Sequence, residues 1–169
     1  MSRKKAAAGP GTPATTALTH AGVAYTTHPY THDPASGLGY GLEAAAALGV
    51  PPEAVFKTLV VHVDGLRGSG LAVGVVPVSA SLDLKAIARA LGHKKATMAD
   101  GAAAERSSGY VMGGISPIGQ RTALPTVVDT SAHSLVTMYV SGGRRGFDLG
   151  LAPADLVAVT GGRFAPIAH

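Results

Sequence analysis

The chain has 169 residues, of which 46% are hydrophobic and 14% are charged, so it can pack one domain and is too poor in charge for a disordered protein. It contains no cysteine, which excludes disulfides, thiolate nucleophiles and cysteine-based zinc sites. No apolar run reaches the roughly 18 residues that span a bilayer, and the N-terminus lacks an apolar secretory segment. We therefore expect a soluble cytoplasmic protein with no membrane contact.

The net charge of +4 is concentrated at the N-terminus, where Arg3, Lys4 and Lys5 leave a nearly balanced remainder of 11 basic and 10 acidic residues. A contact with nucleic acid must then come from local clustering of basic residues. Residues 1–12 are rich in Ala, Gly and Pro. We expect a flexible basic tail over 1–12 and a single domain over 13–169.

The first half of the chain is expected to form a helix, an extended segment, an alanine-rich helix and two strands, over residues 13–21, 23–30, 42–48, 55–63 and 71–78. Gly22 and Gly49 follow the two helices directly, as glycines at helix ends commonly do. An Asp-Gly pair at 64–65 predicts a turn between the two strands.

The second half is expected to form two helices, a strand-like segment, three short strands and a last helix, over residues 82–92, 99–109, 109–112, 125–129, 134–142, 146–151 and 152–162. Residues 163–169 are interpreted as a tail. Parallel crossovers need a dozen or more residues, so the closely spaced later strands predict antiparallel pairing. The expected fold class is α+β, with a curved, mixed but mostly antiparallel, barrel-like sheet and helices packed outside it.

One charged residue interrupts the first predicted strand. Lys57 shares a strand face with Val55, Leu59 and Val61, all of them apolar. Its side chain can pack its stem and keep its ammonium in water. Alternatively it points into an enclosed cavity, where the ammonium must find an anion such as a phosphate or carboxylate, or lose its proton.

Two glycine-rich segments are also candidates for function. The segment "GGISPIG" at Gly113–Gly119 is either an ordinary tight loop or a loop whose backbone N–H groups hold a carbonyl or an oxyanion. The segment "YVSGGRRGFD" at Tyr139–Asp148 is either a solvated turn or a hairpin tip whose arginines contact a nucleic-acid backbone. In the second interpretation, Ser141 and Asp148 face a pocket.

A metal site is not expected, although "HPYTHDP" brings His28, His32 and Asp33 close together in sequence. Pro29 and Pro34 prevent the helical spacing that would place two histidines on one face.

Six segments occur here in one order, namely "HPYTHDP", "VFKTLV", "LDLKAIARALGHKKATMAD", "RSSGYVMGGISPIGQ", "LPTVVD" and "YVSGGRRG". Together they resemble the YbaK family of aminoacyl-tRNA deacylases, relatives of the editing domain of prolyl-tRNA synthetases, over about residues 14–168. The resemblance is nearest to the Cys-tRNA(Pro) deacylase type. It implies the editing-domain fold and a trans-editing enzyme of translation quality control that releases cysteine from mischarged Cys-tRNA(Pro).

The resemblance also implies roles for individual residues. The essential lysine of the family falls on Lys57, and Gly113 begins its G-x-x-x-P loop, whose backbone would stabilise the ester oxyanion. The implied substrate contacts are Tyr30, Tyr40, Gly114, Ser116, Pro117, Ser141 and Asp148. Tyr40 stands where relatives often carry Phe, so one pocket wall gains a hydroxyl.

The sequence shows no cysteine and no serine with a recognisable base, which favours chemistry done by the substrate. In this family the thiol of the cysteine substrate is thought to attack its own ester, so neither a metal nor an organic cofactor is implied. The expected partners are the tRNA(Pro) acceptor end and prolyl-tRNA synthetase. Two alternatives stay open: a deacylase for another small residue, as in Ala-tRNA(Pro), and a non-catalytic module that binds tRNA or a nucleotide.

Overall fold

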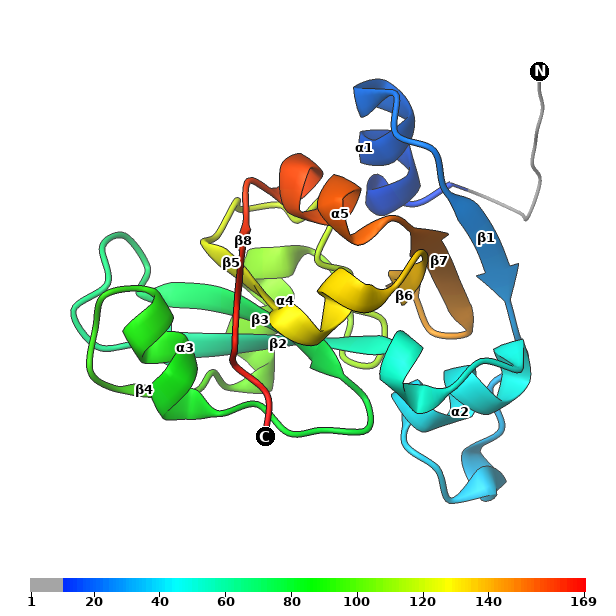
Figure 1. The fold of residues 1–169 in the computed structure, drawn as a ribbon, viewed down its shortest axis with the longest axis horizontal. Helices are drawn as coiled ribbons and strands as arrows, with labels where there is room; N and C mark the ends of the chain where they lie inside the picture. The colour runs from blue at the N-terminus through cyan, green and yellow to red at the C-terminus, as the bar shows by residue number, and fades with distance from the viewer. Residues whose placement is uncertain (1–10) are drawn as a thin grey trace.

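Residues 11–169 are described in the computed structural model. The helices are α1 (Pro13–Ala21), α2 (Tyr40–Leu48), α3 (Leu84–Ala90), α4 (Gly101–Ser108) and α5 (Pro153–Thr160). The strands are β1 (Thr26–Pro29), β2 (Phe56–Val63), β3 (Leu71–Pro77), β4 (Ala96–Met98), β5 (Thr126–Asp129), β6 (Met138–Arg144), β7 (Phe147–Leu151) and β8 (Arg163–Ala165). Figure 1 shows α2 near one end of the molecule and the turn of the β2–β3 hairpin, with α3, at the other.

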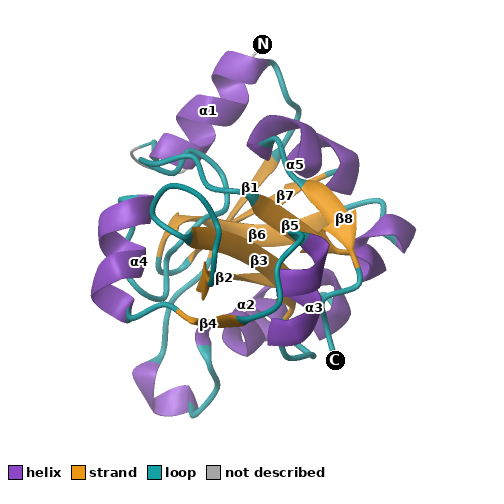
Figure 2. Cartoon of the chain, turned by 90° about the vertical axis from the view of Figure 1, so that its left-hand side faces the viewer, coloured by secondary structure: helices purple, strands orange, loops and turns teal. Residues whose placement is uncertain are grey.

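The strands form two sheets rather than the single curved sheet expected from the sequence. One sheet has the order β1-β7-β6, and the other has the order β4-β2-β3-β5-β8. A parallel bridge between Val55 and Tyr139 joins them just before β2 begins. Helices lie around the sheets, as expected (Figure 2). The α+β class is confirmed, while no closed barrel is found among residues 11–169.

The pairing is mostly antiparallel, with one correction. Strands β1–β7, β6–β7, β2–β3 and β2–β4 pair antiparallel. Strand β5, expected to be antiparallel, instead pairs in parallel with β3 and with β8. The prediction was wrong because it considered only strands adjacent in sequence, whereas the partners of β5 are separated from it by the long crossovers that parallel pairing needs.

Several local assignments also differ from those expected. Residues 109–112 form turns rather than a strand, and the expected tail contains β8. Strand β4 was not predicted at all. Strands of three residues carry too little periodicity to be recognised. The expected basic tail falls mostly on residues 1–10, which lie outside the described part, but its last residue, Thr12, is buried and caps α1.

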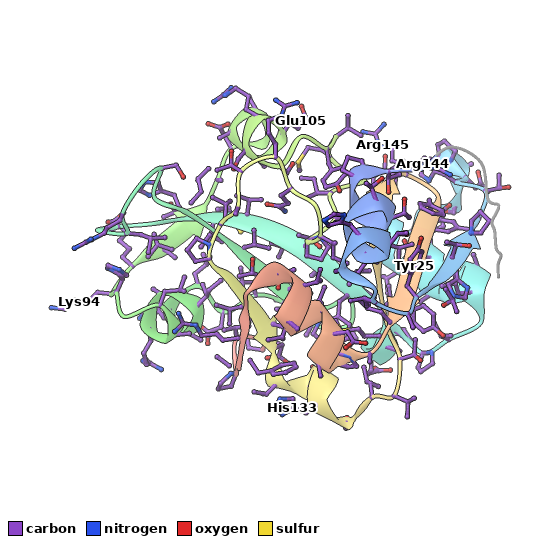
Figure 3. All side chains as sticks on the ribbon, turned by 90° about the horizontal axis from the view of Figure 1, so that it is seen from above. Tyr25, Lys94, Glu105, His133, Arg144 and Arg145 are labelled. Carbon is purple, nitrogen blue, oxygen red and sulfur yellow. The ribbon has the colours of Figure 1, made fainter. Side chains whose placement is uncertain are left out.

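The position of α1 is fixed at both ends by its sequence. The Thr12 hydroxyl accepts from Thr15 N, and the Thr15 hydroxyl accepts from Thr12 N, forming a reciprocal cap at the N-terminus. The Thr12 hydroxyl also donates to Gly142 O in β6, at 2.5 Å. Gly22 ends the helix with φ of 71°. This arrangement ties α1 to the β6–β7 hairpin, whose turn carries Arg144 and Arg145 (Figure 3).

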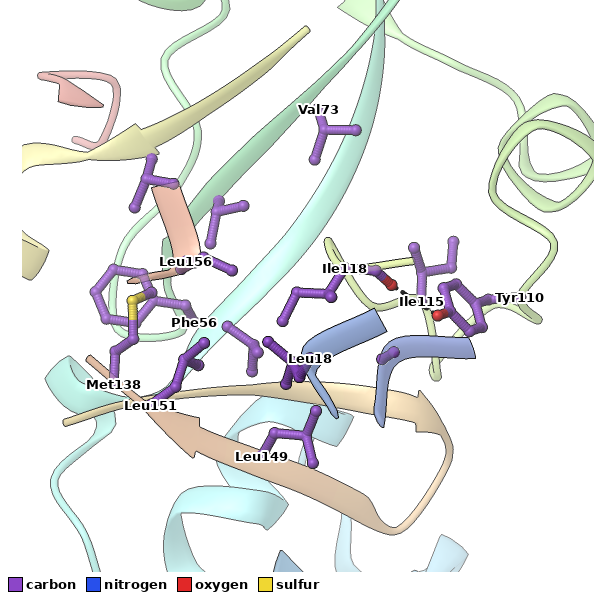
Figure 4. Close-up of a cluster of buried hydrophobic side chains, with 14 of the residues drawn as sticks. Leu18, Phe56, Val73, Tyr110, Ile115, Ile118, Met138, Leu149, Leu151 and Leu156 are labelled. Atoms are coloured by element: carbon purple, nitrogen blue, oxygen red, sulfur yellow. Dashed lines mark hydrogen bonds between the residues drawn. The ribbon is translucent and has the colours of Figure 1, made fainter. Parts of the chain in front are cut away.

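The largest buried cluster lies between the two sheets and against α1 and α5. It includes Leu18, Phe56, Val73, Tyr110, Ile118, Met138, Leu149 and Leu156 (Figure 4). The Tyr110 hydroxyl donates to Ile118 O at 2.7 Å, which satisfies its one polar group. This hydrogen bond joins Tyr110 to Ile118 and so holds together the two ends of the glycine-rich loop that connects these residues. None of the helices in residues 11–169 is long and apolar enough to cross a membrane.

Candidate functional site

A cavity of about 210 Å³ lies where the N-terminal end of β2 meets α2 and the β6–β7 hairpin. Its lining residues come from five segments and are Tyr30, Tyr40, Gly41, Ala44, Val55, Phe56, Lys57, Thr58, Leu59, Met112, Gly113, Ile115, Ser141 and Asp148. The cavity therefore collects six of the nine residues assigned to the site from the sequence. Most of the remaining wall is apolar.

Lys57 lies at the second position of β2, opposite Val76 of β3. Its side chain is half-buried and lines the cavity. No hydrogen bond or ion pair within residues 11–169 engages its ammonium. A cation held beside an apolar cavity without a protein counter-ion favours an anionic ligand.

Gly113 borders the cavity from the opposite loop, with φ of 86°. A Cβ atom at this position would lie 2.6 Å from Tyr40 Cε2 and 3.0 Å from Arg145 Nε, so only glycine fits. Within the described residues no hydrogen bond uses the N–H of Gly113, whereas the N–H of Gly114 donates to Val111 O at 2.9 Å. Gly113 is thus the residue of this pair that can donate to a ligand.

Asp148 is buried in the cavity wall, directly opposite Ser141 in the β6–β7 register. Burial raises the pKa of Asp148 to about 7 because the carboxylate loses its hydration. Burial also raises the pKa of Tyr30 to about 12, and the neighbouring Asp148 and Glu43 add to that rise. The hydroxyl of Ser141 accepts from Gly143 N at 3.2 Å. This wall offers a neutral phenol, a hydroxyl and a carboxyl group whose charge changes near neutral pH.

Three predicted contact residues do not line the cavity. Gly114 is packed against the backbone of Arg144, where a Cβ atom would lie 2.9 Å from three backbone atoms. Ser116 is fully buried, and its hydroxyl accepts from Ile118 N at 3.2 Å. Pro117 is also buried behind the loop. These residues lie in the loop that contains Gly113, and a contact between them and a ligand stays a prediction.

A polar contact that the sequence did not predict joins α2 to the loop after β1, two segments that both contribute to the cavity wall. Glu43 is buried on α2, where Oε1 accepts from His32 Nδ1 and Oε2 accepts from Asp33 N, each at 2.6 Å. The hydrogen bond from His32 is the main cause that lowers the pKa of Glu43. His32 also packs on Tyr40, with ring centroids 4.7 Å apart. The sequence around Glu43 did not predict these hydrogen bonds, because the partners His32 and Asp33 lie eleven and ten residues earlier.

The geometry is suited to holding an anionic ester rather than to protein-based nucleophilic attack. Lys57 offers a positive charge, and Gly113, which lines the same cavity, has a backbone N–H with no hydrogen bond among residues 11–169. Ser141 receives its hydrogen bond from a backbone amide, and no histidine of residues 11–169 bonds to it. The site can therefore bind and orient a reacting group, which is the part of catalysis that positioning supplies.

Comparison with known proteins places this site in a family. Residues 41–159, more than half of the chain, match the family model described as the aminoacyl-tRNA editing domain. A relative from Enterococcus faecalis, named "Putative Cys-tRNA(Pro)/Cys-tRNA(Cys) deacylase EbsC", is 38% identical over 123 residues, which cover 73% of each chain.

Two crystal structures share the fold. That of a "putative trans-editing enzyme for prolyl tRNA synthetase" has a TM-score of 0.78 at 24% identity and covers 93% of this chain and 95% of its own. That of the hypothetical protein APE2540 has a TM-score of 0.81 at 24% identity and covers 94% of this chain and 100% of its own. The expected α+β class and its likeness to editing-domain structures are confirmed, and the chain belongs to the aminoacyl-tRNA editing domain family.

Proposed function

We propose that the protein is a trans-editing deacylase that releases cysteine from mischarged Cys-tRNA(Pro). Membership of the editing family and 38% identity to a relative named as a deacylase for Cys-tRNA support this activity. The observation that carries the proposal is the cavity itself, which is lined by Lys57, whose ammonium has no partner among residues 11–169, and by Gly113, whose N–H makes no hydrogen bond within them. An aminoacyl-tRNA end presents a phosphate and an ester carbonyl to these two groups.

In this proposal, different site residues contact different parts of the substrate. Lys57 binds the phosphate of the terminal nucleotide as a compact positive charge. The N–H of Gly113 donates to the ester carbonyl and stabilises negative charge that develops on its oxygen. Tyr30, Ser141 and Asp148 form the wall for the amino-acid end, where a small polar side chain fits.

The reaction uses the thiol of the substrate as the nucleophile. The cysteine sulfur attacks the ester carbonyl, a carbon–sulfur bond forms, and the bond from the carbonyl carbon to the ribose oxygen breaks. The thiol proton leaves with that oxygen as the hydroxyl of free tRNA, and cysteine departs as a cyclic thiolactone. Positioning of the two reacting groups can lower such a barrier by roughly 7–11 kcal/mol.

Two features of the cellular setting are part of the same proposal. The charge of the chain beyond its first five residues is nearly balanced, which suits delivery of the substrate by prolyl-tRNA synthetase better than strong independent binding of tRNA. Translation editing of this kind takes place in the cytoplasm. Co-purification of the two proteins with and without tRNA(Pro) tests their association.

The test of the activity is a deacylation assay on purified mischarged tRNAs, with Lys57→Ala as the site variant and Lys85→Ala as its matched control. Lys85 is an exposed lysine on α3. We expect wild type and Lys85→Ala to release cysteine from Cys-tRNA(Pro), and Lys57→Ala to be inactive with an unchanged circular dichroism spectrum. Full activity of Lys57→Ala would remove that residue from the mechanism. Faster release from Ala-tRNA(Pro) than from Cys-tRNA(Pro) would overturn the substrate assignment.

A further inference from the structure

Two exposed apolar side chains, Tyr40 and Met112, line the cavity. Residues 11–169 contain seven large exposed hydrophobic side chains, and five of them lie in two short segments that each contribute residues to the cavity lining: Leu38, Tyr40, Leu42, Val111 and Met112. The other two, Met98 on β4 and Val136 before β6, lie elsewhere. Clustered apolar exposure on a folded surface usually indicates a binding site.

Arg145 connects these two segments into one surface, which we call the mouth platform: Tyr40, Met112 and Arg145. The Nε of Arg145 donates to Met112 O at 2.9 Å, and its guanidinium lies 5.5 Å from the centroid of the Tyr40 ring. The N–H of Met112 donates to Glu105 Oε2 of α4 at 2.8 Å. In Figure 3, Arg145 and Glu105 lie along the same side of the molecule. The platform is therefore held in place before any ligand binds.

The size of the cavity limits how much of a tRNA end it can hold. At about 210 Å³ it is smaller than the roughly 300–1,000 Å³ typical of sites for small molecules. If the proposed function holds and the aminoacyl terminus occupies the cavity, the preceding nucleotides must leave through the mouth. They then pass directly over the platform.

The chemistry of the platform matches unpaired nucleotides. An exposed tyrosine ring and a thioether offer flat or adaptable apolar surfaces to bases, and an arginine can stack on a base or pair with a phosphate. A protein partner would also cover apolar side chains. The platform adjoins the cavity, and Arg145 puts a positive charge at its edge. Both features favour nucleic acid over a protein partner.

We propose that the mouth platform binds the unpaired nucleotides that precede the terminal adenosine of the tRNA. The proposal rests on the proposed deacylase function and extends it from the reacting end to the adjoining single strand. It predicts that part of the affinity for substrate comes from outside the cavity. Removal of those nucleotides should therefore weaken substrate binding.

The experiment compares Cys-tRNA(Pro) with the cysteinyl ester of adenosine 5′-phosphate, which carries the same ester and the phosphate assigned to Lys57 but no preceding nucleotide, and which we call cysteinyl-adenosine below. Met112→Ala and Arg145→Ala are the platform variants. Met98→Ala is a matched control, because Met98 is 50% exposed and Met112 is 47% exposed. We expect each platform variant to lose at least about fivefold more kcat/KM on Cys-tRNA(Pro) than on cysteinyl-adenosine, the low end for losing one stacked base. The control should lose nothing on either substrate.

Equal losses on both substrates would overturn the proposal, since they would mean that the platform serves the cavity alone. Unchanged kinetics with weaker binding to prolyl-tRNA synthetase would assign the surface to a protein partner and would also overturn it. Failure of the wild type to cleave either substrate would contradict the deacylase function. In that case, the binding of an RNA oligonucleotide ending in CCA tests separately whether the platform binds nucleotides. Met112→Ala should bind it more weakly than Met98→Ala does.

Discussion

Ser141 and Asp148 lie directly opposite each other in the β6–β7 register, and both line the cavity. The hairpin thus places a hydroxyl beside a buried carboxyl group whose pKa is raised to about 7 by burial. In water the same carboxyl group would be ionised far below neutral pH. The charge of this wall therefore changes close to neutral pH.

Asp148 should make the stability of the protein depend on pH. The folded state keeps a proton on Asp148 up to about pH 7, whereas the unfolded chain releases it near pH 4. Stability from this residue is therefore complete below pH 4 and is lost as the pH rises to 7 and beyond. We expect the free energy of unfolding of Asp148→Asn to exceed that of wild type by on the order of 3 kcal/mol at pH 8. At pH 4 the two values should be similar.

Urea unfolding of both proteins at the two pH values measures this difference. Asp129 offers a control, because its carboxylate accepts hydrogen bonds from Ser131 and Ile167. Asp129→Asn is expected to lose stability at pH 8 rather than gain it. The same pH dependence in Asp148→Asn and wild type would show that folding does not raise the pKa of Asp148.

Local chemistry allowed much of the site to be predicted. A lysine within an apolar strand indicated a cavity, because a buried ammonium needs an anion, and Lys57 does line one. Paired glycines indicated close backbone approach, and Gly113 has the positive φ that requires glycine. In both cases the signal lay within a short segment of the sequence.

Other features depended on contacts between distant segments. The bonds from His32 and Asp33 to Glu43 cross a loop, and a solvated glutamate would have the same sequence. Ser116 was expected to contact substrate, yet its hydroxyl turns inward to Ile118. The parallel pairing of β5 depends on partners far away in sequence. Such contacts are fixed by tertiary packing, which local propensity and spacing do not encode.

Lys57 should contribute to activity and not to stability. No hydrogen bond or ion pair among residues 11–169 compensates its half-buried ammonium. Methionine has a similar length and removes that charge from apolar surroundings. We expect Lys57→Met to leave the free energy of unfolding unchanged or to raise it by about 1 kcal/mol, while deacylation is lost. Urea unfolding and the deacylation assay measure the two effects. A clear loss of stability would reveal a structural role for the ammonium.

Gly113 should tolerate alanine less well than another glycine of similar conformation. Gly113 has φ of 86° and no room for a Cβ atom beside Tyr40, whereas Gly37 has φ of 76° and nothing within 4 Å. We expect Gly37→Ala to cost about 1 kcal/mol from backbone strain alone, and Gly113→Ala to cost roughly 2–4 kcal/mol. Thermal and urea unfolding measure both. Equal costs would mean that Tyr40 moves aside freely, so that the mouth of the cavity is not a fixed surface.

Glu43 should position the walls of the cavity through its two hydrogen bonds. Glutamine has one acceptor oxygen, so Glu43→Gln can satisfy either His32 or Asp33 N but places an N–H₂ group against the other. Because these bonds lower the pKa of Glu43, its stabilising effect is present above the ordinary pKa of 4.5 and is lost as the pH falls through the lowered value. We expect Glu43→Gln to lower the melting temperature at pH 7, with a smaller difference near pH 3.

We also expect Glu43→Gln to raise KM more than it lowers kcat, since Tyr40 packs on His32. Glu53→Gln, at an exposed glutamate, is the control and should change neither quantity. A kcat loss with unchanged KM would instead place Glu43 in the chemical step.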